Sequence, residues 1–349
     1  RQRLMCIRDR YNTGGAQSMA LRAGASVINM EFVNYTVVPR DFSASGLNAI
    51  VGMGGYLVNA SGERFLYKYH EKGEQGPRWV MPWGVYWETV NGRGPCFFDV
   101  RHLSKSAITH LEGHLLPVDK NTFGDWLEQM SIDISTDLFE ATICEGQHPA
   151  FLGAVSGVNV DDYFHTNVPG LMAAGASAPA IGSLIGAMCT GIAAGIDAAD
   201  YVAKVTTLPD PSPSAIEERK QHHCRPLDNK NGLSYRPFED RLRQIMSSYA
   251  AIGRTRSGLE IGLAELEKLS NCTLRGETGH DLLRCCEATQ LHDVALMIVR
   301  GAIIREESRF GLSHYRGDFP ESRTEFHKGI TQTLIKDEIK YGEIARYEL

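Results

Sequence analysis

The stretch that decides the fold is GLMAAGASAPAIGSLIGAMCTGIAAGIDAADY, residues 170–201. No Asp, Glu, Lys or Arg occurs between Tyr163 and Ile196. The pattern predicts a short apolar strand over residues 171–174, then a turn rich in Gly, Ser and Pro, and then a helix. A strand, a tight turn and a helix in this order form a unit that can hold a cofactor.

Small residues determine what this unit can bind. Gly175, Ala176 and Ser177 let a flat ligand approach the backbone, and the N–H groups at the helix start near Ser183 can bind a polar or anionic edge. A membrane span is the alternative, because the uncharged run exceeds the roughly 20 residues that a bilayer requires. The composition argues against it, since Gly, Ala, Ser and Thr dominate over Leu, Ile and Phe, and Pro179 divides the run.

Two segments of this stretch, VPGLMAAGAS (168–177) and GSLIGAMCTGIAAG (182–195), resemble the C-terminal flavin-binding segment of the fumarate reductase and succinate dehydrogenase flavoprotein superfamily. That superfamily also includes L-aspartate oxidase and the flavin subunit of adenylylsulfate reductase. Other motifs match in the same order over most of residues 11–330. The resemblance implies FAD as the cofactor and, from this stretch, the following contacts with it: Gly175, Ala176, Ser183 and Leu184.

A second segment, NTGGAQSMALRAGASVINMEF (12–32), predicts a turn, a helix that stops at Gly24 and a short strand. It is similar to a superfamily segment in which Asn-Thr-Gly-Asp-Gly contacts the flavin, with Gly15 here in place of the Asp. The resemblance therefore adds Thr13, Gly14 and Gly15 as FAD contacts. The GxGxxG turn that binds the FAD pyrophosphate in the family does not open this chain. Residues 52–55, GMGG, are the nearest candidate, but no helix is predicted after them, so we do not expect a phosphate-binding loop there.

Composition excludes several classes of protein. With 349 residues, 43% of them hydrophobic and 22% charged, the chain is large enough for two or three domains. A net charge of -6 gives no basic surface for nucleic acid. The eight cysteines contain no CxxC pair, so we expect no metal site. They are too few for a dense disulfide scaffold, so the expected compartment of the protein is the reducing cytoplasm. We expect no integral membrane segment. The first ten residues, RQRLMCIRDR, lack an initiating Met and match nothing that follows, which suggests a fragment whose export signal the sequence cannot reveal.

Residues 34–145 are expected to form the capping domain. YLVNASGERFLYKY (56–69) alternates apolar and polar residues around a turn, which predicts a hairpin. Gly76-Pro77-Arg78 then precedes WVMPWGVYWETVNGRGPCFFDVRHL (79–103), which is similar to the start of the family's cap helix, with Glu88 ten residues after the Arg. In dicarboxylate members that Arg exchanges a proton with the substrate carbon, so the resemblance makes Arg78 the candidate catalytic residue.

Aromatic residues follow Arg78 at helical spacing: Trp79, Trp83, Tyr86 and Trp87. We expect this face to pack in the core beneath the cap. The alternative is a wall over the flavin ring or over an aromatic substrate.

The substrate anchors of the dicarboxylate enzymes are missing. The family places a substrate-binding His four residues before a Gly pair, whereas this chain has Leu152 there, and His148 lies too early. The family's loop with a substrate-clamping Arg is replaced by residues 176–182, which contain no Arg. Each such charge-assisted bond contributes on the order of 1.5 to 3 kcal/mol. We therefore expect a substrate other than succinate or fumarate.

The remaining chain is expected to be a Pro-rich linker (206–214) followed by a helical domain. Helices are predicted at 237–249, 256–269, 281–307 and 324–341. IIREESRFGLSHYRGDFPES (303–322) and IGRTRSGLEIGLAELEKL (252–269) are similar to the family's C-terminal helical domain. His222-His223-Cys224 lacks the second ligand cluster that a metal site in a linker needs.

Taken together, we expect an α/β flavin-binding domain, Rossmann-like and incomplete, with an inserted α+β capping domain and a C-terminal helical domain. The expected boundaries are 1–33 and 146–205 for the flavin domain, 34–145 for the cap, and 206–349 for the linker and helical domain. The expected activity is FAD-dependent hydride exchange with a small-molecule substrate. Two alternatives stay open: an adenylylsulfate-reductase-like flavin subunit with an iron–sulfur partner, and a flavoprotein-like structural subunit whose site has decayed. The sequence does not identify the substrate, the electron acceptor, the mode of FAD attachment or the oligomeric state.

Overall fold

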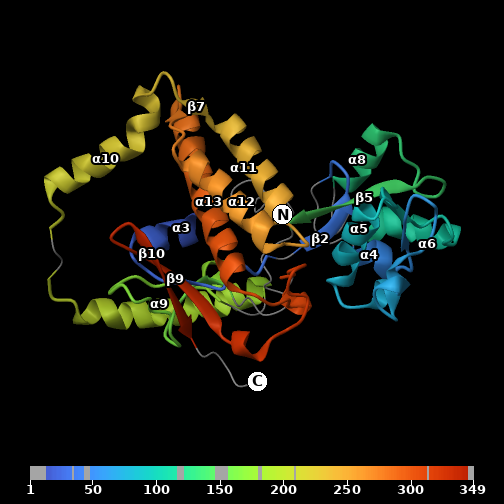
Figure 1. The fold of residues 1–349 in the computed structure, drawn as a ribbon, viewed down its shortest axis with the longest axis horizontal. Helices are drawn as coiled ribbons and strands as arrows, with labels where there is room; N and C mark the ends of the chain where they lie inside the picture. Colours follow the sequence, from blue (N-terminus) through green and yellow to red (C-terminus); the bar gives the residue numbers. More distant parts are fainter. Residues whose placement is uncertain are drawn as a thin grey trace. The chain divides into compact units, whose positions relative to one another are not determined.

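A computed structural model describes residues 13–33, 35–42, 48–115, 122–145, 156–179, 183–207, 210–312 and 314–344. The chain divides into two compact units (Figure 1). Unit 1 contains residues 33–147, and unit 2 contains residues 13–32 together with 148–349. The expected cap, 34–145, lies within unit 1. A division of unit 2 into a flavin domain and a helical domain stays a prediction.

Unit 1 is built on an antiparallel sheet in the order β2-β5-β4-β3. Its strands are β2 (Tyr35–Pro39), β3 (Tyr56–Val58), β4 (Cys96–Asp99) and β5 (Phe139–Glu145). Its helices are α4 (Asn48–Gly52), α5 (Val80–Val90), α6 (Lys105–His110) with the π-turn η3 (Leu111–Leu115), and α8 (Phe123–Met130). The helix predicted after Arg78 is therefore confirmed.

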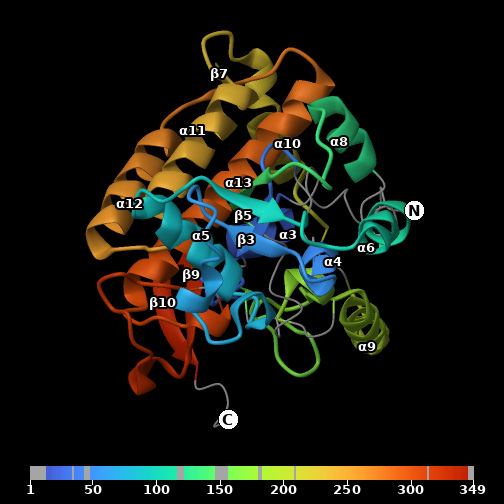
Figure 2. The same ribbon diagram turned by 90° about the vertical axis from the view of Figure 1, so that its right-hand side faces the viewer.

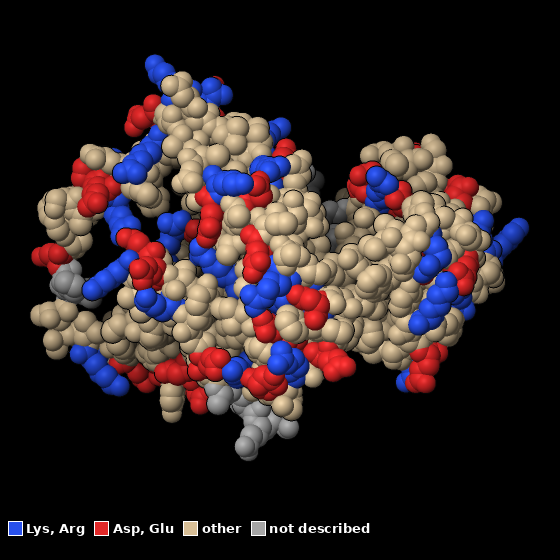
Figure 3. Space-filling model, viewed as in Figure 1, with Lys and Arg blue, Asp and Glu red and all other residues tan. Residues whose placement is uncertain are grey.

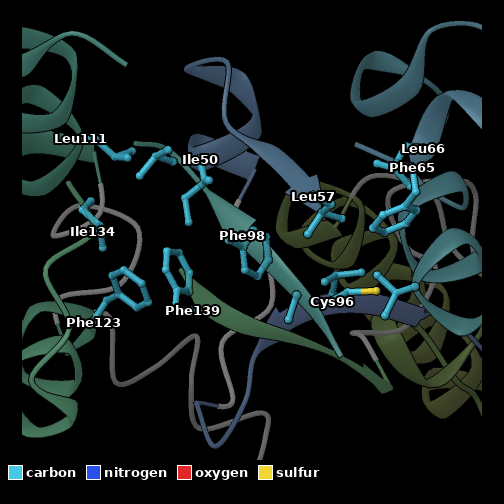
Figure 4. Packing of buried hydrophobic residues seen from close by; sticks show 14 of the residues in the cluster. Ile50, Leu57, Phe65, Leu66, Cys96, Phe98, Leu111, Phe123, Ile134 and Phe139 are labelled. Carbon is cyan, nitrogen blue, oxygen red and sulfur yellow. The ribbon is translucent and has the colours of Figure 1, made fainter. Parts of the chain in front are cut away.

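Apolar side chains from the sheet and these helices form the core of unit 1. Phe98 of β4 stacks on Phe139 of β5 with ring centroids 5.1 Å apart, and Phe123 of α8 lies edge-on to Phe139 at 6.1 Å. Figure 4 shows these rings with Ile50, Leu57 and Leu111 pointing into one cluster. Burial of each such side chain stabilises the fold by about 1.5–3 kcal/mol.

The hairpin predicted over residues 56–69 is wrong in its second arm. Within this fully described segment, a single bridge, Val58 with Arg64, joins the two arms, and the chain then enters the 3₁₀ turn η1 (Leu66–Lys68). The partner of β3 is instead β4, with Leu57 opposite Phe98. Packing of Phe65 and Leu66 into the core outweighs the local alternation. In the GMGG segment, α4 ends at Gly52 and the chain turns into β3.

Unit 2 contains a helical layer in which α11 (Tyr235–Tyr249), α12 (Arg256–Ser270) and α13 (Gly279–Ile304) lie side by side (Figures 1 and 2). Thr278 caps α13 and accepts a hydrogen bond from the Asp281 N–H, while Asp281 bonds back to the cap. The predicted helices at 237–249, 256–269 and 281–307 are confirmed, the last ending three residues earlier. A two-stranded parallel ribbon, β7 (Leu233–Ser234) and β8 (Leu274–Arg275), lies at the ends of these helices.

The predicted helix over 324–341 is wrong. After the turn η6 (Thr324–Phe326), the chain forms a hairpin of β9 (Gly329–Ile335) and β10 (Glu338–Ile344). Lys336 and Asp337 form its two-residue turn with φ of 50° and 63°, the conformation of a type I′ turn. Ile330, Thr331 and Thr333 fit a strand better than a helix because β-branched side chains lose freedom in a helix.

This hairpin extends an antiparallel sheet in the order β10-β9-β1-β6. The inner strand β1 (Val27–Ile28) follows helix α3 (Gly15–Arg22) and pairs with β9 and with β6 (Gly157–Val158). The helix, the stop at Gly24 and the short strand predicted for residues 12–32 are confirmed. The strand predicted over 171–174 is wrong, because the segment forms one isolated bridge, His165 with Met172.

Two long helices complete unit 2. The turn η4 (Gly175–Ser177) leads to α9 (Ser183–Lys204), which confirms the predicted helix. Helix α10 (Pro213–Asp228) begins inside the segment expected to be a linker. In the part of the chain that the structure describes, no helix combines the length and apolar character needed to cross a membrane. On the face drawn in Figure 3, basic and acidic side chains are interspersed.

Candidate functional site

Two turns that are far apart in the sequence lie together in unit 2. Gly14, with φ of 70°, precedes α3, and Gly175, with φ of 63°, opens η4. Gln17 of α3 donates from Nε2 to the Ala176 carbonyl at 3.4 Å and so links them. The structure therefore brings together five of the residues predicted to contact FAD: Thr13, Gly14, Gly15, Gly175 and Ala176.

The first turn is fixed by close packing against α13. A Cβ on Gly14 would lie 2.5 Å from Val294 Cγ2, and one on Gly15 would lie 2.8 Å from Gln290 Oε1. The buried Thr13 donates from Oγ1 to the same Gln290 oxygen at 3.0 Å. A side chain at Gly14 would therefore collide with α13, whereas the end of the Gln290 side chain could move to admit one at Gly15.

Helix α3 is also tied to α13 at its far side. Asp293 accepts a 2.5 Å bond from Ser18 Oγ and two bonds from Arg22, at 2.6 and 2.8 Å. Charge-assisted, bidentate contacts of this kind are the stronger class of hydrogen bond. Sequence reasoning missed Gln17, Gln290 and Asp293, because single polar residues in two distant helices carry no local signal that they meet.

The second turn is held by α9 and β6. Gly175 N–H donates to Thr190 Oγ1 of α9 at 3.0 Å, and a Cβ on Gly175 would lie 3.2 Å from Ala187 Cβ. Gly157 of β6, with φ of 138°, lies against this turn, because a Cβ there would be 2.7 Å from the Ser177 carbonyl oxygen. The small side chain of Ala187 therefore lets the turn approach α9.

The start of α9 supplies the remaining predicted contacts. Ser183 is its first residue, and the side chain of Leu184 next to it is 70% exposed. Ile185 and Met188 are also exposed, so the first turns of α9 present an apolar surface. The contacts of α9 with η4 are made by Ala187 and Thr190, which follow Ser183 and Leu184 in the same helix.

These residues fit a flavin. Two backbone turns without bulky side chains leave room for a flat ring, and exposed apolar side chains at the start of α9 suit its apolar surface. The first N–H groups of α3 lack partners within the helix and can bind polar ring edges. The seven predicted contacts contribute no charge that would oppose binding: Thr13, Gly14, Gly15, Gly175, Ala176, Ser183 and Leu184.

Arg78 belongs to unit 1, where it lies two residues before α5 and is half-buried. Helix α5 is anchored by Glu88, whose carboxylate is fully buried and accepts two bonds from Arg93, at 2.7 and 2.8 Å. It also accepts bonds from Tyr69 Oη and Asn59 Nδ2, both at 2.8 Å. The Arg93 hydrogen bonds lower the pKa of Glu88 to about 2, while burial and then the Glu88 bond raise the pKa of Tyr69 to about 12. This network fixes the helix that follows Arg78.

The expected core packing of the α5 aromatic residues is wrong for three of the four. The side of α5 that faces the core carries other residues: Val80, Pro82, Gly84, Val85 and Glu88. Trp79 packs against that core, but Trp83, Tyr86 and Trp87 are half-buried on the opposite side and contact one another. The helical spacing was right, but spacing alone does not tell which side faces the core.

Unit 2 also buries a cluster of charged groups from the family-like segment 303–322. Arg305 is buried and donates to Glu31 Oε1 at 2.5 Å, Asn29 Oδ1 at 3.0 Å and Glu307 Oε1 at 3.0 Å. His314 is also fully buried, and burial, followed by the nearby Arg254, holds its pKa well below its usual value. The motif was visible in the sequence, but its connection to β1 through Glu31 and Asn29 was not.

Two weaker candidates from the sequence have no support here. His148 and Leu152 lie outside the described residues. Within the described ranges, no group of three or more His, Cys, Asp or Glu side chains is arranged to hold a metal ion, and this includes His222, His223 and Cys224.

Known protein families and curated proteins resemble this chain over most of its length. A family model described as an FAD binding domain matches residues 2–191, and one described as the fumarate reductase flavoprotein C-term matches residues 239–345. One subunit of the fumarate reductase (CoM/CoB) of Methanothermobacter marburgensis is 32% identical over 91% of this chain and 59% of its own length. L-aspartate oxidase 1 of Ralstonia nicotianae is 29% identical over 89% of this chain and 57% of its own length. The chain thus spans less than two thirds of each relative.

Solved structures agree in fold. A mutant of the quinol fumarate reductase protein FrdA of E. coli superposes with a TM-score of 0.79 at 22% identity and covers 97% of this chain and 62% of that protein. Adenylylsulfate reductase of Archaeoglobus fulgidus gives a TM-score of 0.75 at 21% identity, over 95% and 61% of the two chains. The flavoprotein fold with a helical C-terminal part is therefore confirmed.

Proposed function

This chain belongs to the fumarate reductase and succinate dehydrogenase flavoprotein superfamily, and on that premise we propose that the whole protein is an FAD-dependent oxidoreductase acting on a small molecule. The observation that carries the proposal is the meeting of the Gly14 and Gly175 turns beside the apolar start of α9. We also propose the cytoplasm as its compartment, because the cysteine pattern is typical of a reducing environment.

The residues proposed to hold FAD are those of the two turns and of the α9 start: Thr13, Gly14, Gly15, Gly175, Ala176, Ser183 and Leu184. When bound, FAD supplies hydride exchange at its N5 atom. Gln290 and Val294 support the first turn from α13, and Thr190 supports the second from α9. The chain's role is then to orient the ring and to exclude water from it.

Arg78 is the proposed proton donor or oxyanion clamp. A guanidinium binds a carboxylate or oxyanion with two parallel bonds, and it can hold a proton close to the reacting carbon. The buried network at Glu88 supports the role by fixing the helix that begins two residues after Arg78. General acid catalysis of this kind contributes about 10²–10⁴-fold in rate.

The test uses the whole protein with FAD bound. We expect Arg78→Gln to lower kcat by about 10²–10⁴-fold without lowering flavin content. The matched control is Arg40→Gln in the same unit, since Arg40 is exposed and pairs with Glu140. Equal activity of Arg78→Gln and wild type would remove Arg78 from the mechanism. Loss of FAD in Arg78→Gln would assign it a structural role instead.

We propose that the substrate is not a C4 dicarboxylate. The support is the absence of an Arg from residues 176–182 and of a His at position 152. The relative named fumarate reductase makes fumarate the first compound to assay. Turnover of fumarate or succinate faster than of other acids would overturn this part of the proposal and leave the rest standing.

A second candidate is an adenylylsulfate-reductase-like flavin subunit with an iron–sulfur partner. Residues 32–41 and 91–95 resemble that branch of the superfamily, and the short segment at 176–182 suits it better than the dicarboxylate pattern. Reduction of adenylylsulfate by the protein with a ferredoxin-like partner would select it. If the whole protein binds no flavin after reconstitution, the third possibility, a structural subunit with a decayed site, takes its place.

A further inference from the structure

Helix α10 touches the rest of unit 2 at few points. Nearly all of its residues are exposed, and only Cys224 and Pro226 are half-buried. In Figure 1 the end of α10 that carries them lies beside α13, and α10 also packs against β8. Cys224 is therefore one of the two residues through which this helix is attached.

Hydrogen bonds confirm that three segments converge there. Gly276 N–H donates to the Pro226 carbonyl at 2.8 Å, and Asn229 Nδ2 donates to the Leu274 carbonyl at 3.0 Å. From the other side, Cys285 Sγ of α13 donates to the Arg275 carbonyl at 3.4 Å. The short segment 274–276 thus joins the end of α10 to the first turns of α13.

Within this junction, Cys286 is the thiol available to Cys224. Cys285 is buried and bonded to a carbonyl, whereas Cys286 is half-buried on α13. Both half-buried thiols lie on helices that pack against each other, Cys224 on α10 and Cys286 on α13. Burial, followed by the Cys224 thiol, raises the pKa of Cys286. Adjacent cysteines such as 285 and 286 form a strained pair, so Cys224 is the better partner.

We propose that Cys224 and Cys286 form a redox-sensitive pair, which closes to a disulfide under peroxide and fastens α10 to α13. The Cys224 thiol gives up its proton and attacks hydrogen peroxide, which breaks the O–O bond; the leaving hydroxide takes up that proton, so that a sulfenic acid and water result. The Cys286 thiol then gives up its proton and attacks the Cys224 sulfur; the S–S bond forms as hydroxide leaves and takes up that proton to become a second water. Two thiols lose two electrons, and the peroxide gains them.

The pair needs no oxidising compartment. Disulfides in reducing compartments are typically transient and sense oxidants, and cysteine oxidation follows exposure. Cys272, exposed between α12 and β8, provides an internal control, because it reports whether the oxidant reached the protein. When reduced, α10 is held only by its few contacts; when oxidised, it is covalently anchored close to its C-terminal end.

The test is disulfide mapping of the purified chain after brief treatment with hydrogen peroxide and blocking of free thiols. Trypsin releases Cys224 in peptide 221–230, because the Arg225–Pro226 bond resists cleavage, and Cys286 in peptide 285–300. We expect these two peptides to be linked in wild type and in Cys285→Ser, and to separate on reduction. We expect no link in Cys224→Ser or Cys286→Ser.

A link that survives in Cys286→Ser but disappears in Cys285→Ser would overturn the assignment. Free Cys224 and Cys286 in a sample whose Cys272 is oxidised would overturn the proposal altogether. A second measurement uses the wild-type protein alone and follows tryptic cleavage after Arg219 and Lys220 in α10. We expect the rate of this cleavage to fall by at least about fivefold on oxidation, because cleavage requires local opening of α10. Unchanged cleavage would show that α10 is not fastened.

Discussion

Replacing Arg305 with Met tests whether the buried charge cluster holds β1 in place. The Arg305 side chain is 1% exposed and makes five hydrogen bonds, to Glu31, Glu307, Asn29 and the carbonyls of Phe326 and Lys328. Met has a similar volume, so the change removes the charge and the bonds without leaving a large cavity. The loss of this charge and these bonds mainly affects the Glu31 carboxylate.

The two carboxylates respond differently to the loss of Arg305. Glu307 keeps its 2.5 Å bond from Arg309 Nε and its 3.0 Å bond from the Arg323 N–H. Glu31 is fully buried, and its Oε2 atom already has no hydrogen-bond partner among the described residues. Breaking a buried pair by removing one partner costs about 3–5 kcal/mol, because it leaves an uncompensated charge. We expect Arg305→Met to lower the free energy of unfolding of unit 2 by that amount.

A double variant separates the stranded charge from lost packing. Glu31→Gln with Arg305→Met removes the charge and keeps the shape, so only neutral hydrogen bonds are missing, at about 1–3 kcal/mol. We expect it to be more stable than Arg305→Met alone. Arg309→Met serves as the control, because Arg309 pairs with the same cluster but is 24% exposed, and exposed pairs contribute about 1 kcal/mol or less.

The assay is urea unfolding followed by two signals. All four Trp residues lie in unit 1, so their fluorescence reports on that unit, while circular dichroism at the helix band also follows the helices of unit 2. We expect Arg305→Met to shift the circular dichroism transition and leave the fluorescence transition in place. A loss under about 1 kcal/mol, or a double variant no more stable than the single one, would refute the stranded-charge reasoning.

Three further predictions concern unit 1, the hairpin and the first turn. The Arg93 hydrogen bonds lower the folded-state pKa of Glu88 to about 2, so its stabilisation is present above the unfolded value of about 4.3 and is lost as pH falls towards 2. Urea unfolding followed by Trp fluorescence should show this loss of stability at low pH in wild type and not in Glu88→Gln. Changing Lys336 to Asn and Asp337 to Gly should raise the stability of unit 2 by about 1 kcal/mol, because both positions have positive φ; an unchanged urea midpoint would contradict this. Gly14→Ala should lose FAD affinity in a flavin titration, because its Cβ would meet Val294; Gly24→Ala, with φ of 89° and open space around its Cβ, should keep that affinity.

Local patterns predicted much of the fold. The helices α3, α9, α11, α12 and α13 follow from apolar periodicity, and Gly24 marks a helix end as glycine commonly does. The hairpin at Lys336-Asp337 was missed because neither residue is typical of a type I′ turn, although the neighbouring β-branched residues were a usable signal.

The candidate site was predictable only in part. Both glycine turns were found from the sequence through the family resemblance, and their contact through Gln17 and Ala176 is a tertiary fact that no local pattern contains. The α5 aromatic residues were expected inside the core, yet a helix with apolar residues on two sides does not reveal which side is buried. The partner of Arg305 lies 274 residues away, at Glu31, and only the fold brings them together.

The central claim is that the whole protein binds FAD at the two glycine turns and uses it for redox chemistry. The measurement that tests this most directly is the visible absorption spectrum of the purified whole protein before and after anaerobic reduction. We predict a flavin band near-stoichiometric with protein that bleaches on reduction and is depleted in Gly14→Ala. A protein that stays colourless after reconstitution with FAD would contradict the claim and leave a structural role.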